Sequence, residues 1–166
     1  MPKTRKLALM AMFTAASLIV FVIEAQIPAP IPVPGVKLGL ANVVTLIAMV
    51  MLGRREAGLI LLVRIAMGSM FTGGVSAFIF SIAGGALAYA VMCLTLKLFP
   101  EKLLWVVSVL GAIAHNLGQL IAAIIITKTS SLMLYAPVLL ASAVVTGAFT
   151  GIAAMYLTQR LDKRVG

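Results

Sequence analysis

The sequence is poor in charge and nearly devoid of cysteine and histidine. Only 10% of its 166 residues are charged, whereas 63% are hydrophobic. Charged residues make up about 25% of an ordinary soluble domain, so that class is excluded. The single cysteine, Cys93, excludes an intrachain disulfide and a cysteine cluster for metal. It lies within an apolar run, where we expect a small, buried packing residue.

Acidic residues are scarce and widely separated, at Glu24, Glu56, Glu101 and Asp162. A Mg²⁺–diphosphate site needs several oxygen ligands close together, and this spacing does not supply them. His115 is the only histidine and has no second ligand of a suitable type for zinc. The sequence therefore predicts no catalytic residues, no metal site and no cofactor, which is to say a protein that is not an enzyme.

What the sequence does contain is a series of long apolar segments with basic residues at every second break between them. The basic breaks are residues 4–6, 53–56, 97–102 and 160–164, whereas residues 28–37, 72–76 and 127–131 carry only Lys37 and Lys128. This is the positive-inside pattern of a membrane protein with an even number of crossings and both ends in the cytoplasm. We accordingly assign the net charge of +9 to topology and lipid headgroups rather than to nucleic acid.

The apolar segments predict one all-α integral membrane domain over residues 1–166, with six transmembrane helices and cytoplasmic termini. The predicted helices cover about 7–27, 37–52, 57–72, 75–98, 102–127 and 132–158. The second and third, near 16 residues, would each span only about 24 Å. We expect the protein in a cell membrane, namely the cytoplasmic membrane of a bacterium.

The first outer break, Pro28 to Gly35, carries four prolines at alternate positions, which forbid helix and favour a stiff, extended path. It is either a rigid spacer at the interface or a lid over an outward-facing cavity.

Small residues mark two further places where helices can approach closely. Ala8, Ala11 and Ala15 fall on one face of the first helix, where they serve either internal packing or docking of another membrane subunit. We expect the glycines at 147 and 151 to serve internal packing.

Polar side chains inside a membrane are expensive and therefore functional candidates. The candidate substrate-binding residues are Glu24, Asn42, Arg64, Ser81, His115, Asn116 and Gln119. All except Arg64 and Asn116 fall, by the helical rise, in the outer half of the bilayer. The same rise places Glu24 roughly 15 Å above Arg64, so a direct ion pair requires a shift of several residues in helix register or stretched side chains. Arg64 would then contact an anionic part of a ligand or the carbonyls of a helix end.

His115 and Gln119 are four residues apart and so share one helix face, which lines either a cavity or a packed polar seam. Asn116 is rotated by one position and can reach a neighbouring helix.

Several segments together resemble the Gx transporter family, which is also labelled heptaprenyl diphosphate synthase component I. They are PGVKLGLAN at 34–42, Arg64, SIAGG at 81–85 and GAIAHNLGQ at 111–119. That family in turn resembles the substrate-binding S-components of energy-coupling factor (ECF) importers. The resemblance implies six helices, a first loop over an outward-facing vitamin site, and small residues on the first helix that dock to a transmembrane coupling subunit.

Three functions follow from these observations. The first is the substrate-binding subunit of an importer, which captures a small vitamin- or cofactor-related molecule. It would need partner ATPases, because the sequence has no Walker A motif. The second is a membrane-embedded accessory subunit of a prenyl diphosphate synthase, and the third is a solitary channel or passive carrier. The substrate is left open, although Arg64 and Lys37 hint at an anionic group.

Overall fold

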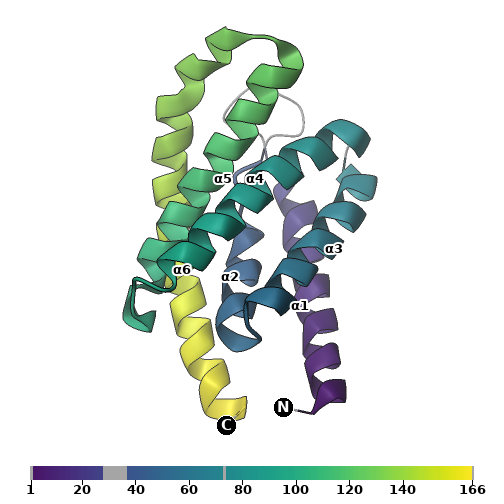
Figure 1. Ribbon diagram of the computed structural model, residues 1–166, viewed down its shortest axis with the longest axis vertical. Helices are drawn as coiled ribbons and strands as arrows, with labels where there is room; N and C mark the ends of the chain where they lie inside the picture. The colour runs from purple at the N-terminus through teal and green to yellow at the C-terminus, as the bar shows by residue number, and fades with distance from the viewer. Residues whose placement is uncertain (1, 28–36, 73, 166) are drawn as a thin grey trace.

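The computed structural model describes residues 2–27, 37–72 and 74–165, and this part of the chain is helical without any strand (Figure 1). The all-α prediction is thus confirmed. The elements are α1 (Lys3–Glu24), α2 (Asn42–Met51), α3 (Arg54–Thr72), α4 (Gly74–Thr95), the short 3₁₀ helix η1 (Glu101–Leu103), α5 (Leu104–Thr127), the 3₁₀ helix η2 (Ser130–Tyr135) and α6 (Ala136–Val165).

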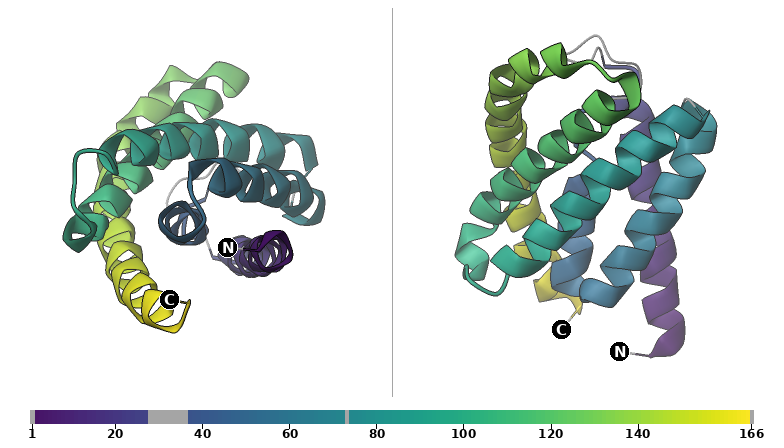
Figure 2. Two further views of the ribbon diagram at one scale, coloured as in Figure 1. Left: turned by 60° about the horizontal axis from the view of Figure 1, so that its bottom comes forward. Right: turned by 45° about the horizontal axis from the view of Figure 1, so that its top comes forward.

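The short helix α2 lies at the centre of the arrangement. It contacts each of the other five α-helices, while α1 packs on α3, α3 on α4, α4 on α5 and α5 on α6. Figure 2 shows the five outer helices curving around α2, with α1 and α6 at the two ends of the curve. Any side chain on α2 or just before it therefore lies within reach of several helices.

Both chain ends lie at the same end of the bundle, as do the α2–α3 turn and the connection from α4 to α5 (Figure 1). The junction of α3 with α4, and η2, lie at the opposite end. Every second break thus falls on one side, as the distribution of Lys and Arg predicts. The contact between Lys6 of α1 and Glu56 of α3 joins two helices near the basic end.

The helix lengths differ from those expected for six membrane-spanning helices. Four segments, namely α1, α4, α5 with η1, and α6 with η2, are long and apolar enough to cross a membrane. The helix expected at 37–52 begins only at Asn42, because Gly39 adopts a left-handed backbone with φ +82° that interrupts a helix. Its ten residues rise about 15 Å, half of a bilayer core. Helix α3 carries four charged residues and is correspondingly less apolar.

The outer surface of the bundle is strongly apolar. Met70 is 82% exposed, Val75 76% and Phe149 74%. In water such a surface would aggregate, whereas in a bilayer it contacts lipid chains. The protein is therefore a helical membrane protein. The proline-rich segment expected to act as spacer or lid lies outside the described residues.

Glycines bring α4, α5 and α6 into close contact. A Cβ atom on Gly147 would lie 2.7 Å from the Cα of Val109, and one on Gly151 would lie 2.5 Å from the Cα of Trp105. The prediction that these two glycines serve internal packing is confirmed. A Cβ on Gly118 would likewise lie 2.7 Å from the carbonyl oxygen of Ala83, so α5 approaches the α4 backbone there.

The small residues of α1 behave differently. Ala8, Ala11 and Ala15 are exposed, while Ser17, Phe21 and Glu24 form the buried face of the helix. The three alanines therefore do not serve internal packing within the described part of the chain.

Candidate functional site

Six of the seven predicted site residues converge from five helices. They gather away from the chain termini, around a small polar cavity where α1, the start of α2, α3, α4 and α5 meet. The residues that line it are Phe21, Glu24, Lys37, Gly39, Arg64, Ser81, His115 and Gln119, and Asn42 joins them through Arg64.

Glu24 anchors the chain segment that enters α2. Its carboxylate accepts hydrogen bonds from the backbone N–H groups of Gly39 and, at 3.4 Å, of Ala41. The side chain is 3% exposed, and a buried carboxylate is tolerated only with such partners. Glu24 therefore fixes the site's architecture from the end of α1.

Arg64 projects from α3 into the cluster and is 2% exposed. Its Nη2 donates a 3.3 Å hydrogen bond to Asn42 Oδ1, and its guanidinium carbon lies 5.7 Å from the centre of the Phe21 ring. The ammonium group of Lys37 lies over the same ring, 3.3 Å from its centre. One aromatic ring thus faces two cations, which it attracts through its negative face.

Gln119 and His115 form the α5 side of the site. The Oε1 of Gln119 accepts the backbone N–H of Lys37 at 3.0 Å. The imidazole of His115 packs against the Gly84 backbone without a well-aligned hydrogen bond. A Cβ on Gly84 would lie 2.7 Å from Gln119 Cγ and 2.9 Å from His115 Cε1, so glycine leaves the room that these two side chains occupy.

The defining property of this cluster is its unmet hydrogen-bonding capacity. Among the described residues no partner is present for five buried atoms of the lining: Arg64 Nε, Ser81 Oγ, both ring nitrogens of His115, and Gln119 Nε2. A buried polar group left without a partner costs about 1–3 kcal/mol. The space available to the centre of a water molecule is about 10 Å³, enough for roughly one water. A larger molecule needs side chains to move aside.

Asn116 is the predicted site residue that the structure places elsewhere. Its Nδ2 donates a 2.9 Å hydrogen bond to the carbonyl oxygen of Leu139 in α6. Asn116 thus joins α5 to α6, the neighbouring-helix contact that its rotation from His115 allows, and does not line the cavity.

The 15 Å offset expected between Glu24 and Arg64 is too large. Phe21 packs against Gly68, where a Cβ would lie 2.5 Å from the ring. Glu24 lies one turn above that contact and Arg64 one turn below it, an offset of about 10 Å along the helices. No ion pair joins them, as expected.

Two residues of the site were missing from the predicted set. Phe21 is three residues before Glu24 and so shares its helix face, which is a signal that the spacing contained. For Lys37 the sequence indicates only a possible role in binding an anionic group. It lies between α1 and α2, is 7% exposed, and burial lowers its pKa to about 8.

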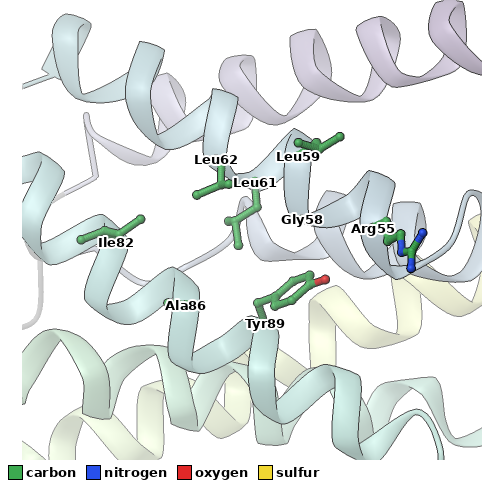
Figure 3. A pocket seen from close by; sticks show the side chains of 8 residues that line it. All are labelled: Arg55, Gly58, Leu59, Leu61, Leu62, Ile82, Ala86 and Tyr89. Carbon is green, nitrogen blue, oxygen red and sulfur yellow. The ribbon is translucent and has the colours of Figure 1, made fainter.

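A larger groove, between α3 and α4, has a different character (Figure 3). It measures about 520 Å³ and runs between α3 and α4, lined by Arg55, Gly58, Leu59, Leu61, Leu62, Ile82, Ala86 and Tyr89. Leu59 and Leu62 are more than half exposed, and the Tyr89 hydroxyl donates to the Arg54 carbonyl oxygen at 2.8 Å. This open aliphatic surface suits lipid chains, so the smaller polar cavity is the better candidate for solute binding.

A buried polar cluster within an apolar helical bundle defines a helical membrane protein with a candidate binding site. The chain matches the family described as heptaprenyl diphosphate synthase component I over residues 13–157. It belongs to that family. No curated protein and no solved structure matches it.

Proposed function

We propose that this protein is the substrate-binding membrane subunit of an ECF-type importer, which captures a small vitamin- or cofactor-related molecule from the outer side of the cell membrane. The observation that carries the proposal is the cluster of buried polar atoms without partners around Arg64, His115 and Gln119. Such atoms are unfavourable in a purely structural seam, because a packed seam satisfies its own hydrogen bonds. A polar solute would supply the missing partners.

The position of the cluster supports capture from outside. It includes Glu24 at the last residue of α1 and Asn42 at the first residue of α2, whereas the chain termini and the α2–α3 turn lie at the other end of the bundle (Figure 1). If the basic end faces the cytoplasm, as the positive-inside rule requires, the cavity faces the exterior.

In this proposal the protein performs no chemistry and depends on partners for energy. The exposed alanines at positions 8, 11 and 15 leave a smooth strip on α1 where another transmembrane helix can approach closely. We assign this strip to a coupling subunit that recruits ATPases.

The experiment that tests capture is purification in a mild detergent, followed by mass spectrometry of the small molecules released on denaturation. We expect one solute in near-stoichiometric amount, and its loss in a Gln119→Leu variant. The matched control is Gln26→Leu, which removes the same amide from an exposed position beyond α1. Repeated purification with no retained solute, and no solute that raises the thermal stability, would rule capture out.

The family description favours a second function, an accessory subunit of a prenyl diphosphate synthase. The sequence contains only one aspartate, so a Mg²⁺–diphosphate site would have to belong to a separate catalytic subunit. Affinity purification from the native membrane separates the two proposals. An importer subunit brings down a membrane coupling protein with ATPases, and an accessory subunit brings down an aspartate-rich synthase.

A further inference from the structure

The hydrogen bonds inside the cluster fix the orientation of its two amide side chains. Asn42 Oδ1 faces Arg64, and Gln119 Oε1 faces the backbone N–H of Lys37. Both partners can only donate, so each amide must present its oxygen to the partner and its NH₂ group elsewhere. Neither Asn42 Nδ2 nor Gln119 Nε2 has a partner among the described residues.

The polar groups of the cluster that lack a hydrogen-bond partner are therefore mainly donors. Arg64 Nε, Asn42 Nδ2 and Gln119 Nε2 are groups that only donate. The remaining atoms, on Ser81 and His115, belong to groups that can act either way. The unpartnered amide oxygen of Asn116 belongs to the α5–α6 contact, away from the cavity. A molecule that completes this site must bring acceptors.

The charges of the lining side chains also favour a ligand that brings acceptors. Two cationic side chains, Lys37 and Arg64, line the cavity together with one carboxylate, that of Glu24. The Glu24 carboxylate is engaged by backbone N–H groups and forms no ion pair with Arg64. The fixed side-chain charges leave an excess of one positive charge in a buried place, where an unbalanced charge is costly.

Resting on the proposed capture function, we infer that the solute is an anion whose carboxylate or phosphate oxygens lie among Arg64, Lys37 and Gln119. Guanidinium groups bind such oxygens through paired, charge-assisted hydrogen bonds, and the free amide NH₂ groups add further donors. Both cations lie close to the Phe21 ring and line the same cavity, so one anion there can contact both.

The test uses three small probes of similar size and different charge on the full chain in detergent: acetate, acetamide and methylammonium, with inorganic phosphate as a second anion. Thermal unfolding is followed against sodium chloride at equal ionic strength, because phosphate stabilises many proteins without binding. A bound anion at about five times its dissociation constant should raise the unfolding midpoint by about 2–4 °C, and the rise should saturate.

Variants assign that response to the cavity. Lys37→Gln should weaken anion binding by about tenfold, since it removes one charge-assisted contact. Lys97→Gln removes the same charge from an exposed position at the basic end and should leave the response unchanged. Lys37→Arg keeps the charge and should retain the response. A response that is kept in Lys37→Arg and lost in Lys37→Gln therefore reports the charge at this position, whereas its loss in both variants indicates a loss of folding.

The inference is overturned if acetamide or methylammonium stabilises the protein as well as acetate does, or if Lys37→Gln responds like the wild type. A retained solute that proves neutral or cationic overturns the anion assignment and leaves capture standing. The absence of any retained solute, together with no saturable response to any probe, removes both.

Discussion

The contact of Gly118 with α4 gives the sharpest test of how the site is built. A Cβ added to Gly118 would lie 2.7 Å from the carbonyl oxygen of Ala83 and 3.0 Å from its carbonyl carbon. Both atoms are backbone, so no side-chain rotation relieves the clash. Gly118→Ala must separate α4 from α5 by at least about 0.3 Å, and these two helices carry Ser81 on one side and His115 with Gln119 on the other.

The expected size of the effect follows from two opposing terms. Overpacking of a tight contact costs about 1–3 kcal/mol, whereas alanine in place of glycine within a helix gains up to about 1 kcal/mol. We expect the free energy of unfolding to fall by about 1–2 kcal/mol, which lowers the thermal midpoint by about 4 °C in a chain of this length.

Gly85→Ala is the matched control. Its Cβ would lie 2.9 Å from the terminal Cδ1 atom of Ile65 and 3.4 Å from that of Leu61, with Arg64 Nη2 at an ordinary contact distance of 3.8 Å. These methyl ends can turn away, so the change in unfolding free energy should stay within about 1 kcal/mol. Thermal unfolding of both variants in one detergent measures the difference. Equal midpoints, or a more stable Gly118→Ala protein, would refute the close backbone contact between α4 and α5.

Three further predictions concern binding. Burial lowers the pKa of Lys37 to about 8, so its side chain loses its charge as the pH rises through 8. Anion affinity should therefore be weaker at pH 9 than at pH 7, and the difference should be smaller in Lys37→Arg. Gln119→Leu should weaken solute binding about tenfold. Asn116→Leu should leave the affinity unchanged and lower the unfolding free energy by about 1 kcal/mol, because it loses its hydrogen bond to Leu139. Equal losses of affinity in titrations of the two variants would contradict these separate roles. Ala11→Phe on the exposed face of α1 should abolish co-purification of membrane partners without changing the thermal midpoint, and a partner retained at wild-type levels would argue against docking there.

Much of the site was predictable because lipid makes polar side chains conspicuous. Six of the seven residues chosen for being polar within apolar segments do gather in one place. The helical period also indicated that Asn116 points away from His115 and Gln119, although it could not say which helix would receive it.

The sequence by itself determined the class of protein and the two-sided pattern of its breaks, because hydropathy and the placement of Lys and Arg act locally and need no knowledge of neighbours. Only the tertiary structure decided that Glu24 binds the backbone before α2, that Lys37 and Arg64 both lie close to the Phe21 ring, and that the α1 alanines are exposed. These facts depend on how helices slide and rotate against each other. That register is set by individual contacts, such as Phe21 on Gly68, which the rise along a single helix does not contain.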